Sequence, residues 1–272
     1  MHLNMYDKEH YLGSINHAGV EPAKNHKAHF EETYKMLERH NIVKGFVGND
    51  KSSIDEWRAQ DEENKVMWGS GMFYTNELPV TTFEQMVTEG KIKAYGELPP
   101  IYYPHSILNP SSKPYLNICQ KHNIPVSIYL GSSSLKVRYN TNPDRRIADD
   151  DPRLLETIMT AYPNLKVHLL HSIEVYPYMD AVIELMKKYE NIYVSLGSVL
   201  WYGNKHKEYA NNFLKKAKAE GVIDQVMFGS NQQYWPGSIK LSIDYLNSRG
   251  FLTAEEKKAI FYDNAARFLG LN

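Results

Sequence analysis

The sequence predicts an α/β protein whose strands close into an eight-stranded parallel barrel, (β/α)8, as a single domain over residues 1–272. Short β-branched or apolar runs recur along the chain, and each is followed by an amphipathic helical pattern; such repetition implies a parallel sheet. With 42% hydrophobic residues and no linker rich in Pro, Gly or Ser, the chain can build one large core. A doubly wound open sheet is the alternative, but no Gly-x-Gly-x-x-Gly turn follows an early strand.

The sequence predicts eight strands. Seven predicted strands cover residues 42–48, 65–72, 92–98, 124–131, 165–172, 191–197 and 226–230. An eighth, at the start, covers residues 2–5 and is short or truncated, because the given sequence begins one residue before His2. Eight strands are the number that a (β/α)8 barrel requires, and its functional groups lie at the carboxyl ends of the strands.

Helices are predicted between the strands from apolar spacing and end signals. They cover residues 30–40, 82–89, 110–122, 152–161, 178–189, 205–219 and a terminal pair at 238–248 and 253–269. The polar stretch 132–151 is predicted to be a long functional loop rather than a domain boundary.

Charge and cysteine content narrow the class of protein. The 31 basic and 32 acidic residues are mixed along the chain, which carries a net charge of −1, so nucleic acid and anionic membranes are not expected partners. No apolar run reaches the ~20 residues of a membrane helix. The single cysteine, Cys119, is expected to be a buried structural thiol. We therefore expect a cytoplasmic protein that binds a small molecule, with homo-oligomerisation left open.

The most informative stretch is the last predicted strand and the turn after it, Phe228-Gly229-Ser230-Asn231. Gly-Ser-Asn after an apolar run is ordinary turn chemistry. In combination with other strand ends, however, it resembles the amidohydrolase-related (amidohydrolase 2) family of the amidohydrolase superfamily. The resemblance extends from about residue 30 to residue 271. Its matches are residues 41–47, 94–97, 124–131, 166–171, 228–230 and the closing helix 262–271.

The resemblance implies a TIM-barrel hydrolase in which a divalent metal activates water. The family places His-x-His after the first strand, a carboxylate or Lys after the fourth, a His after the fifth and the sixth, and an Asp after the eighth. The positions that match are His2, Glu97 and His171, whereas Asn4, Tyr129 and Asn231 replace ligands. An amide oxygen and a neutral phenol are weak zinc donors. We therefore expect no zinc, or a weakly held zinc on His2 and His171.

The predicted catalytic residues are His171, Glu97, Tyr129 and Asn231. His171 or His2 could act as general base and Glu97 as acid or base, while Tyr129 and Asn231 could donate hydrogen bonds to an oxyanion. The predicted substrate-binding residues are Tyr102, Tyr103, His105, Trp201, Tyr202, Tyr234 and Trp235. His26 and His29 are spaced like neighbours on a helix face or cap, and we expect them to be solvated.

Two functions fit these residues. The first is a hydrolase with a reduced metal site that acts on a small cyclic or aromatic ester, lactone, amide or carboxylate. The second is a pseudoenzyme that binds a small molecule or a partner subunit. Loss of the strand-eight carboxylate favours the pseudoenzyme, and the aromatic, ionisable barrel mouth favours the enzyme.

Overall fold

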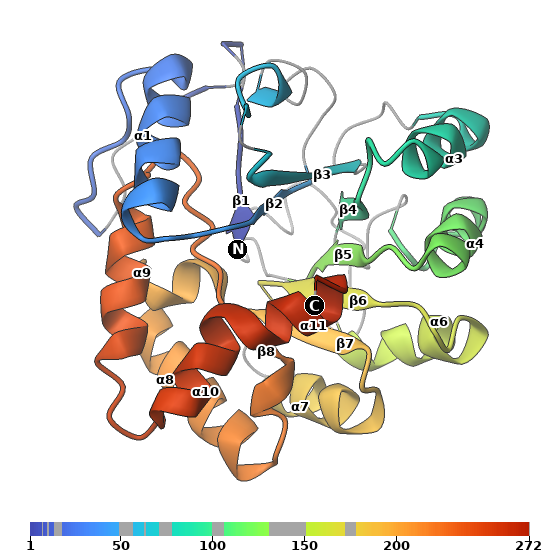
Figure 1. Ribbon diagram of the computed structural model, residues 1–272. Coiled ribbons are helices and arrows are strands. Elements are labelled where there is room, and N and C mark those ends of the chain that lie inside the picture. Colours follow the sequence, from blue (N-terminus) through green and yellow to red (C-terminus); the bar gives the residue numbers. More distant parts are fainter. Residues whose placement is uncertain are drawn as a thin grey trace, which may run out of the picture.

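The computed structural model shows eight parallel strands in sequential order (Figure 1). It describes residues 1–6, 8–9, 11–13, 18–48, 57–62, 64–70, 78–99, 106–130, 151–171 and 178–271. The strands are β1 (His2–Leu3), β2 (Gly45–Val47), β3 (Val66–Ser70), β4 (Ala94–Leu98), β5 (Val126–Tyr129), β6 (Val167–Leu170), β7 (Ile192–Ser195) and β8 (Val226–Met227). Each pairs with the next, as in a TIM barrel, which confirms the predicted fold class.

The first strand is short, as predicted, because β1 has only two residues. Backbone hydrogen bonds pair neighbouring strands from β1 to β8. Side chains join the segments that follow the two outer strands, β1 and β8. The Gln232 amide accepts from the Asn4 backbone N–H at 3.0 Å and donates to the Asn4 carbonyl at 2.7 Å. The Gln232 side chain thus makes the two hydrogen bonds that a paired backbone would make, and it holds the chain after β1 beside the loop after β8.

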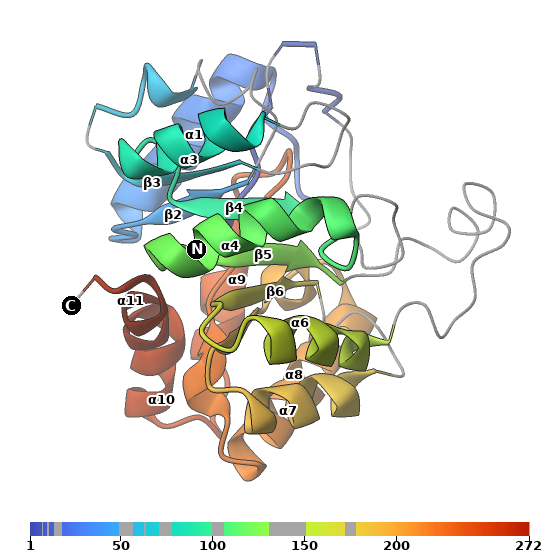
Figure 2. The ribbon, with the colours of Figure 1, turned by 90° about the vertical axis from the view of Figure 1, so that its right-hand side faces the viewer.

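Helices cover the outside of the curled sheet (Figures 1 and 2). They are α1 (His26–Arg39), α3 (Val80–Thr88), α4 (Lys113–His122), α6 (Glu156–Ala161), α7 (Met179–Lys188), α8 (Asn204–Ala219), α9 (Ser238–Asn247), α10 (Ala254–Lys258) and α11 (Asn264–Leu269). Helix α1 begins four residues before its predicted start. Its N-cap Asn25 accepts a hydrogen bond from the Ala28 N–H at 2.9 Å, and this satisfies a backbone donor of the first turn.

Apolar side chains between helices and sheet form the core. Helix α7 shows the pattern, since it buries Ala181, Val182, Ile183, Leu185 and Met186 toward β6 and β7. Each fully buried aliphatic side chain contributes ~1.5–3 kcal/mol relative to exposure. Cys119 is fully buried on α4, as predicted, and burial raises the pKa of its thiol.

Helix α11 lies against the end of the barrel from which the strands start (Figure 2). Its Phe268 ring is 6.0 Å from the ring of His168 on β6 and 4.7 Å from that of Tyr193 on β7. The carboxyl ends of the strands face the opposite way. Within the ranges given above, no helix has both the length and the apolar character that crossing a membrane requires.

Candidate active site

The barrel brings together the residues that the sequence singled out at different strand ends. Nε2 of His2, on β1, lies 3.3 Å from Oε2 of Glu97, on β4. Tyr129 ends β5, and its ring centroid is 4.5 Å from that of His171, which directly follows β6. Asn231, after β8, contacts His171. The five positions therefore meet, while their catalytic and metal-binding roles stay predictions.

Two amides and an imidazole form a hydrogen-bonded chain at the centre of this site. The Asn4 amide donates to Oδ1 of Asn231, and Nδ2 of Asn231 lies 3.0 Å from Nε2 of His171. In this orientation the Asn231 amide donates and Nε2 of His171 accepts. Asn231 and His171 are 2% and 6% exposed, and a buried hydrogen bond of this kind is costly to break because its partners would be left unpaired.

Backbone geometry turns His171 and Asn231 into the site. Side chains alternate along a strand, so His171 would face away from the side that His168 faces. His171 has φ 58°, however, and Asn231 has φ 46°. A left-handed conformation is uncommon for residues other than glycine, and such strained positions cluster at functional sites. The turn after each strand therefore redirects the side chain that the strand alone would point elsewhere.

Glu97 is the charged group of the site. Burial disfavours its ionised form, but the interactions with His2, with a smaller contribution from His171, outweigh burial and lower the pKa of this carboxyl. Its backbone N–H donates to the Gly48 carbonyl at 2.9 Å. A Cβ at Gly48 would lie 2.1 Å from the Gly96 carbonyl oxygen, so only glycine lets β2 approach the backbone beside Glu97.

The described donors do not fit a tightly held zinc. In the part of the chain that the structure describes, no three His, Cys, Asp or Glu side chains are grouped as metal ligands. Nε2 of His171 already contacts the Asn231 amide, and Nε2 of His2 faces Glu97. Catalytic zinc usually takes three protein ligands from His, Cys and carboxylates. Both Nε2 atoms therefore already face protein groups.

The predicted aromatic residues lie beside the loop after β8. Trp201 and Trp235 are 1% and 4% exposed, their ring centroids are 5.6 Å apart, and Nε1 of Trp201 donates to the Ser230 carbonyl at 2.8 Å. Tyr202 packs edge-on against Trp201, with 5.4 Å between the centroids. Tyr234 stacks on Tyr6 at 4.3 Å. Tyr102, Tyr103 and His105 lie outside the described residues, and a substrate-binding role stays a prediction for the whole set.

His29 corrects one expectation. We expected a solvated side chain, but His29 is fully buried, and its ring is 5.5 to 5.8 Å from those of Tyr6, Tyr11 and Trp57. The early start of α1 places it in the first turns, where its Nε2 donates to the Gln233 carbonyl. Burial lowers the pKa of His29 to about 4, so the ring is neutral near pH 7.

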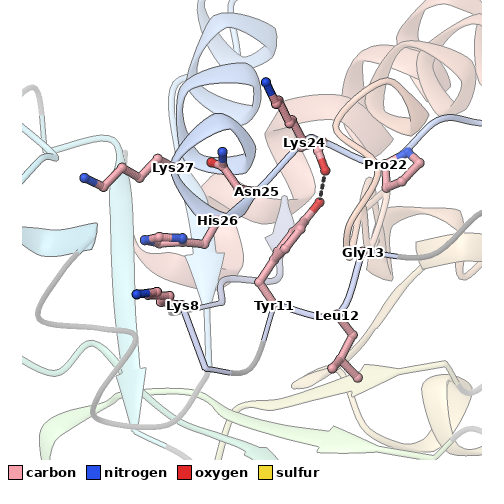
Figure 3. Close-up of a pocket in the computed structure, with 10 residues that line it drawn as sticks. Lys8, Tyr11, Leu12, Gly13, Pro22, Lys24, Asn25, His26 and Lys27 are labelled. Carbon is pink, nitrogen blue, oxygen red and sulfur yellow. Dashed lines mark hydrogen bonds between the residues drawn. The ribbon is translucent and has the colours of Figure 1, made fainter.

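A basic hollow adjoins this region at the start of α1 (Figure 3). Its volume is about 640 Å³, and Lys8, Lys24, His26 and Lys27 are among the residues that line it. Lys8, His26 and Lys27 extend to the same side, whereas Lys24 extends elsewhere (Figure 3). No Asp or Glu is among the described lining residues, and the structure shows no ion pair for the three lysines within the described ranges. The hollow is therefore cationic.

Three polar residues of the barrel interior were missed by sequence reasoning. Gln232 bridges β1 and β8, and Ser127 lies 3.1 Å (Oγ to Nδ1) from His168. The sequence could have indicated Ser127, because it lies two residues before Tyr129 and residues two apart on a strand share a face. Gln232 follows β8 in an irregular turn, and periodicity does not predict its direction.

Comparison with known proteins identifies the family. The amidohydrolase family profile matches residues 96–271, which is more than half of the chain. The chain belongs to the amidohydrolase family. The matched region begins within β4 and continues through β8, so it includes Glu97, Tyr129, His171 and Asn231. A comparison with curated proteins finds no match.

Solved structures similar to this amidohydrolase-family chain share its fold. An uncharacterized TIM-barrel protein from Bordetella bronchiseptica has a TM-score of 0.67 at 17% identity, over 93% of this chain and 87% of the other. A probable 2-pyrone-4,6-dicarboxylic acid hydrolase from Acinetobacter baumannii, with citric acid bound, has 0.66 at 14%, over 99% and 97%. 5-Carboxyvanillate decarboxylase from Sphingomonas paucimobilis has 0.57 at 11%, over 87% and 82%.

Proposed function

We propose that this protein is a hydrolase that opens a small cyclic or aromatic ester, lactone or amide bearing a carboxylate, and that it works without a tightly held metal. The observation that carries the proposal is the buried Glu97 carboxylate beside His2, with His171 near enough to lower its pKa. A buried acid–base pair next to amide donors provides the groups that hydrolysis of an ester or amide requires.

Glu97 is the general base of the proposed reaction. Its lowered pKa keeps the carboxyl ionised at neutral pH. It takes a proton from water as the water oxygen attacks the substrate carbonyl, and the same proton passes to the departing alcohol or amine as the C–O or C–N bond breaks. In the proposed reaction Asn231 and Tyr129 donate hydrogen bonds to the oxyanion. General acid–base catalysis increases the rate ~10²–10⁴-fold and one oxyanion donor ~10²–10³-fold. The proposed hydrolysis can therefore proceed without a metal.

A carboxylate on the substrate is supported by the basic hollow at the rim. Lys8 follows Asn4 closely in sequence, and the Ala23 N–H beside the hollow donates to the Tyr234 carbonyl of the β8 loop at 3.0 Å. Unpaired lysines attract carboxylates over about a Debye length of ~10 Å at 0.1 M salt. Two neighbours in fold bear names of enzymes that act on carboxylated cyclic or aromatic compounds.

A binding protein without turnover is the second candidate. The observation that favours it is Nε2 of His171, which the Asn231 amide already engages, so that this imidazole is not free to take a proton. In that case the Glu97 and His2 pair would serve only to bind the ligand.

Hydrolysis of carboxylated pyrones and aryl lactones by chelator-dialysed protein decides between the two. We expect turnover that survives dialysis and falls about 100-fold or more in kcat/KM for Glu97→Gln. Glu184→Gln, which makes the same change on the exposed face of α7, should stay within about twofold. Ligand binding without turnover would support the second candidate, and turnover that chelation abolishes would refute the metal-independent mechanism.

Lys8 and Lys27 can be tested with the same substrates. Replacing both with Gln should raise KM for a dicarboxylate about 5- to 10-fold at low salt while kcat stays unchanged, because the hollow binds substrate equally before and during reaction. Lys35→Gln, an exposed position further along α1, is the matched control. An equal effect of Lys35→Gln would show a nonspecific charge effect instead.

A further inference from the structure

A small, partly enclosed space lies inside the barrel, between the candidate site and α11. The volume open to the centre of a water molecule is about 30 Å³. Its polar lining comes from four strands, namely His2, Ser127, His168 and Ser195, and its apolar lining includes Phe46 and Phe268. A polar cavity needs ≳10–15 Å³ by this measure to hold a water, so one or two molecules fit.

Polar atoms around this space have no partner in the described protein. They are Nδ1 of His2, Nε2 of His168 and Oγ of Ser195, and their residues are 2%, 6% and 1% exposed. Leaving a buried donor or acceptor unsatisfied costs about 1–3 kcal/mol each. Three such atoms lining one water-sized space indicate that a solvent molecule satisfies them, since water makes about three hydrogen bonds in such sites.

The hydrogen bond between the Ser127 hydroxyl and Nδ1 of His168 bears on which nitrogen of His168 carries the proton. Burial, together with the nearby His2, keeps the pKa of His168 well below its ordinary value, so the ring is neutral. A neutral imidazole has one donor and one acceptor nitrogen. Ser127 has no other partner in the described residues, so a hydrogen bond from its hydroxyl to Nδ1 pairs the serine proton. In that arrangement Ser127 donates to Nδ1, and the proton of His168 lies on Nε2.

His168 and His2 are neighbours of the same aromatic ring. Both line the same space, and the ring of Phe46 is 5.9 Å from His2 and 6.1 Å from His168. We propose that a buried water accepts from Nε2–H of His168 and donates to Nδ1 of His2 and to Oγ of Ser195. Ser127 and His168 are then positioning residues that act on His2 through this water.

The consequence for His2 is a fixed tautomer. With Nδ1 accepting from the water, the proton that His2 directs at Oε2 of Glu97, 3.3 Å away, lies on Nε2. The water and the tautomer do not depend on any reaction. Their effect on turnover rests on the proposed function, in which Glu97 is the base.

Histidine ring NMR on the ¹⁵N-labelled protein without substrate tests the tautomer. We expect the Nε2–H form of His2 in the parent protein. His168→Phe, which removes the donor, should shift the ratio of the two neutral His2 forms by about 5- to 10-fold, the worth of one hydrogen bond. His122→Phe on α4 makes the same change outside the barrel and should leave His2 unchanged.

Two further measurements keep the inference testable if His168→Phe does not fold. A crystal structure of the parent protein at high resolution should show a water within 3.2 Å of His168 Nε2, and Ser127→Ala should change the His2 ratio in the same direction as His168→Phe. An empty cavity, or a parent His2 with its proton on Nδ1, would overturn the inference. Because none of these readouts uses a substrate, absence of turnover would count against the proposed function alone.

Discussion

Asn231 joins side chains from the two ends of the chain, because it accepts from Asn4 and contacts His171. An aspartate has the same shape but bears a negative charge and has no N–H to offer. The Asn231 amide can therefore pair with both neighbours without a cation, whereas a carboxylate at this position could not donate to His171.

Restoring the family residues at the three substituted positions should restore zinc binding. The change is Asn4→His, Tyr129→His and Asn231→Asp together, which adds two nitrogen donors and one charge beside His2 and His171. Four-ligand zinc sites are worth ~10–16 kcal/mol, or roughly 3 kcal/mol per ligand, so zinc affinity should rise more than about 100-fold. Titration calorimetry measures it. Asn4→Gln with Asn231→Gln is the control without new ligands, and equal zinc affinity in both variants would contradict the argument.

Helix α1 is attached to the loop after β8 through His29, which packs among aromatic rings and donates to the Gln233 carbonyl. The folded protein holds this ring neutral, with a pKa of about 4, whereas the unfolded chain protonates it near its ordinary value of 6.5. From pH 6.5 down to 4 only the unfolded state takes the proton, so stability falls as the pH falls through that window.

The loss attributable to His29 is about 3 kcal/mol across the window, from a shift of roughly 2.5 pKa units. Urea unfolding at several pH values measures it. His29→Gln keeps a donor for the Gln233 carbonyl but cannot be protonated, so it should remove this part of the pH dependence. His26→Gln, on the same helix and partly exposed, should keep it. Parallel curves for the parent and His29→Gln would show that His29 ionises freely.

The closing segment α10 to α11 depends on a capping box. The Thr253 hydroxyl accepts from the Glu256 N–H at 3.2 Å, and the Glu256 carboxylate accepts from the Thr253 N–H at 2.8 Å. Thr253→Ala should lower the free energy of unfolding by about 1 kcal/mol. Thr88→Ala, the same change on exposed α3, should alter it by less than about 0.5 kcal/mol. Equal losses in chemical denaturation would argue against a capping role.

Across the whole molecule, periodicity predicted the strands and helices because each element carries its own pattern of apolar residues. All eight strands lie within their predicted ranges, and the strand-end position was enough to bring Glu97, Tyr129 and His171 together. What the sequence did not predict depends on contacts distant in the chain. The burial of His29 depends on the loop after β8, and the hydrogen-bonded chain through Asn231 depends on two left-handed turns.

The same arrangement makes a prediction about the thermal stability of the whole protein. A ligand that binds only the folded state stabilises it by RT ln(1 + [L]/Kd), about 2.7 kcal/mol at a hundredfold excess over Kd. Asn4, Asn231 and His171 already hydrogen-bond one another, so zinc should add little. We expect the melting temperature of the purified protein to change by less than about 2 °C on exhaustive chelation or on addition of 100 µM zinc, as followed by calorimetry, since ~1 kcal/mol corresponds to roughly 2–4 °C at this size. The triple variant Asn4→His, Tyr129→His and Asn231→Asp should gain several degrees with zinc and lose them with chelator. A parent protein that melts several degrees lower after chelation would show that it holds a metal whose ligands include residues beyond the described site.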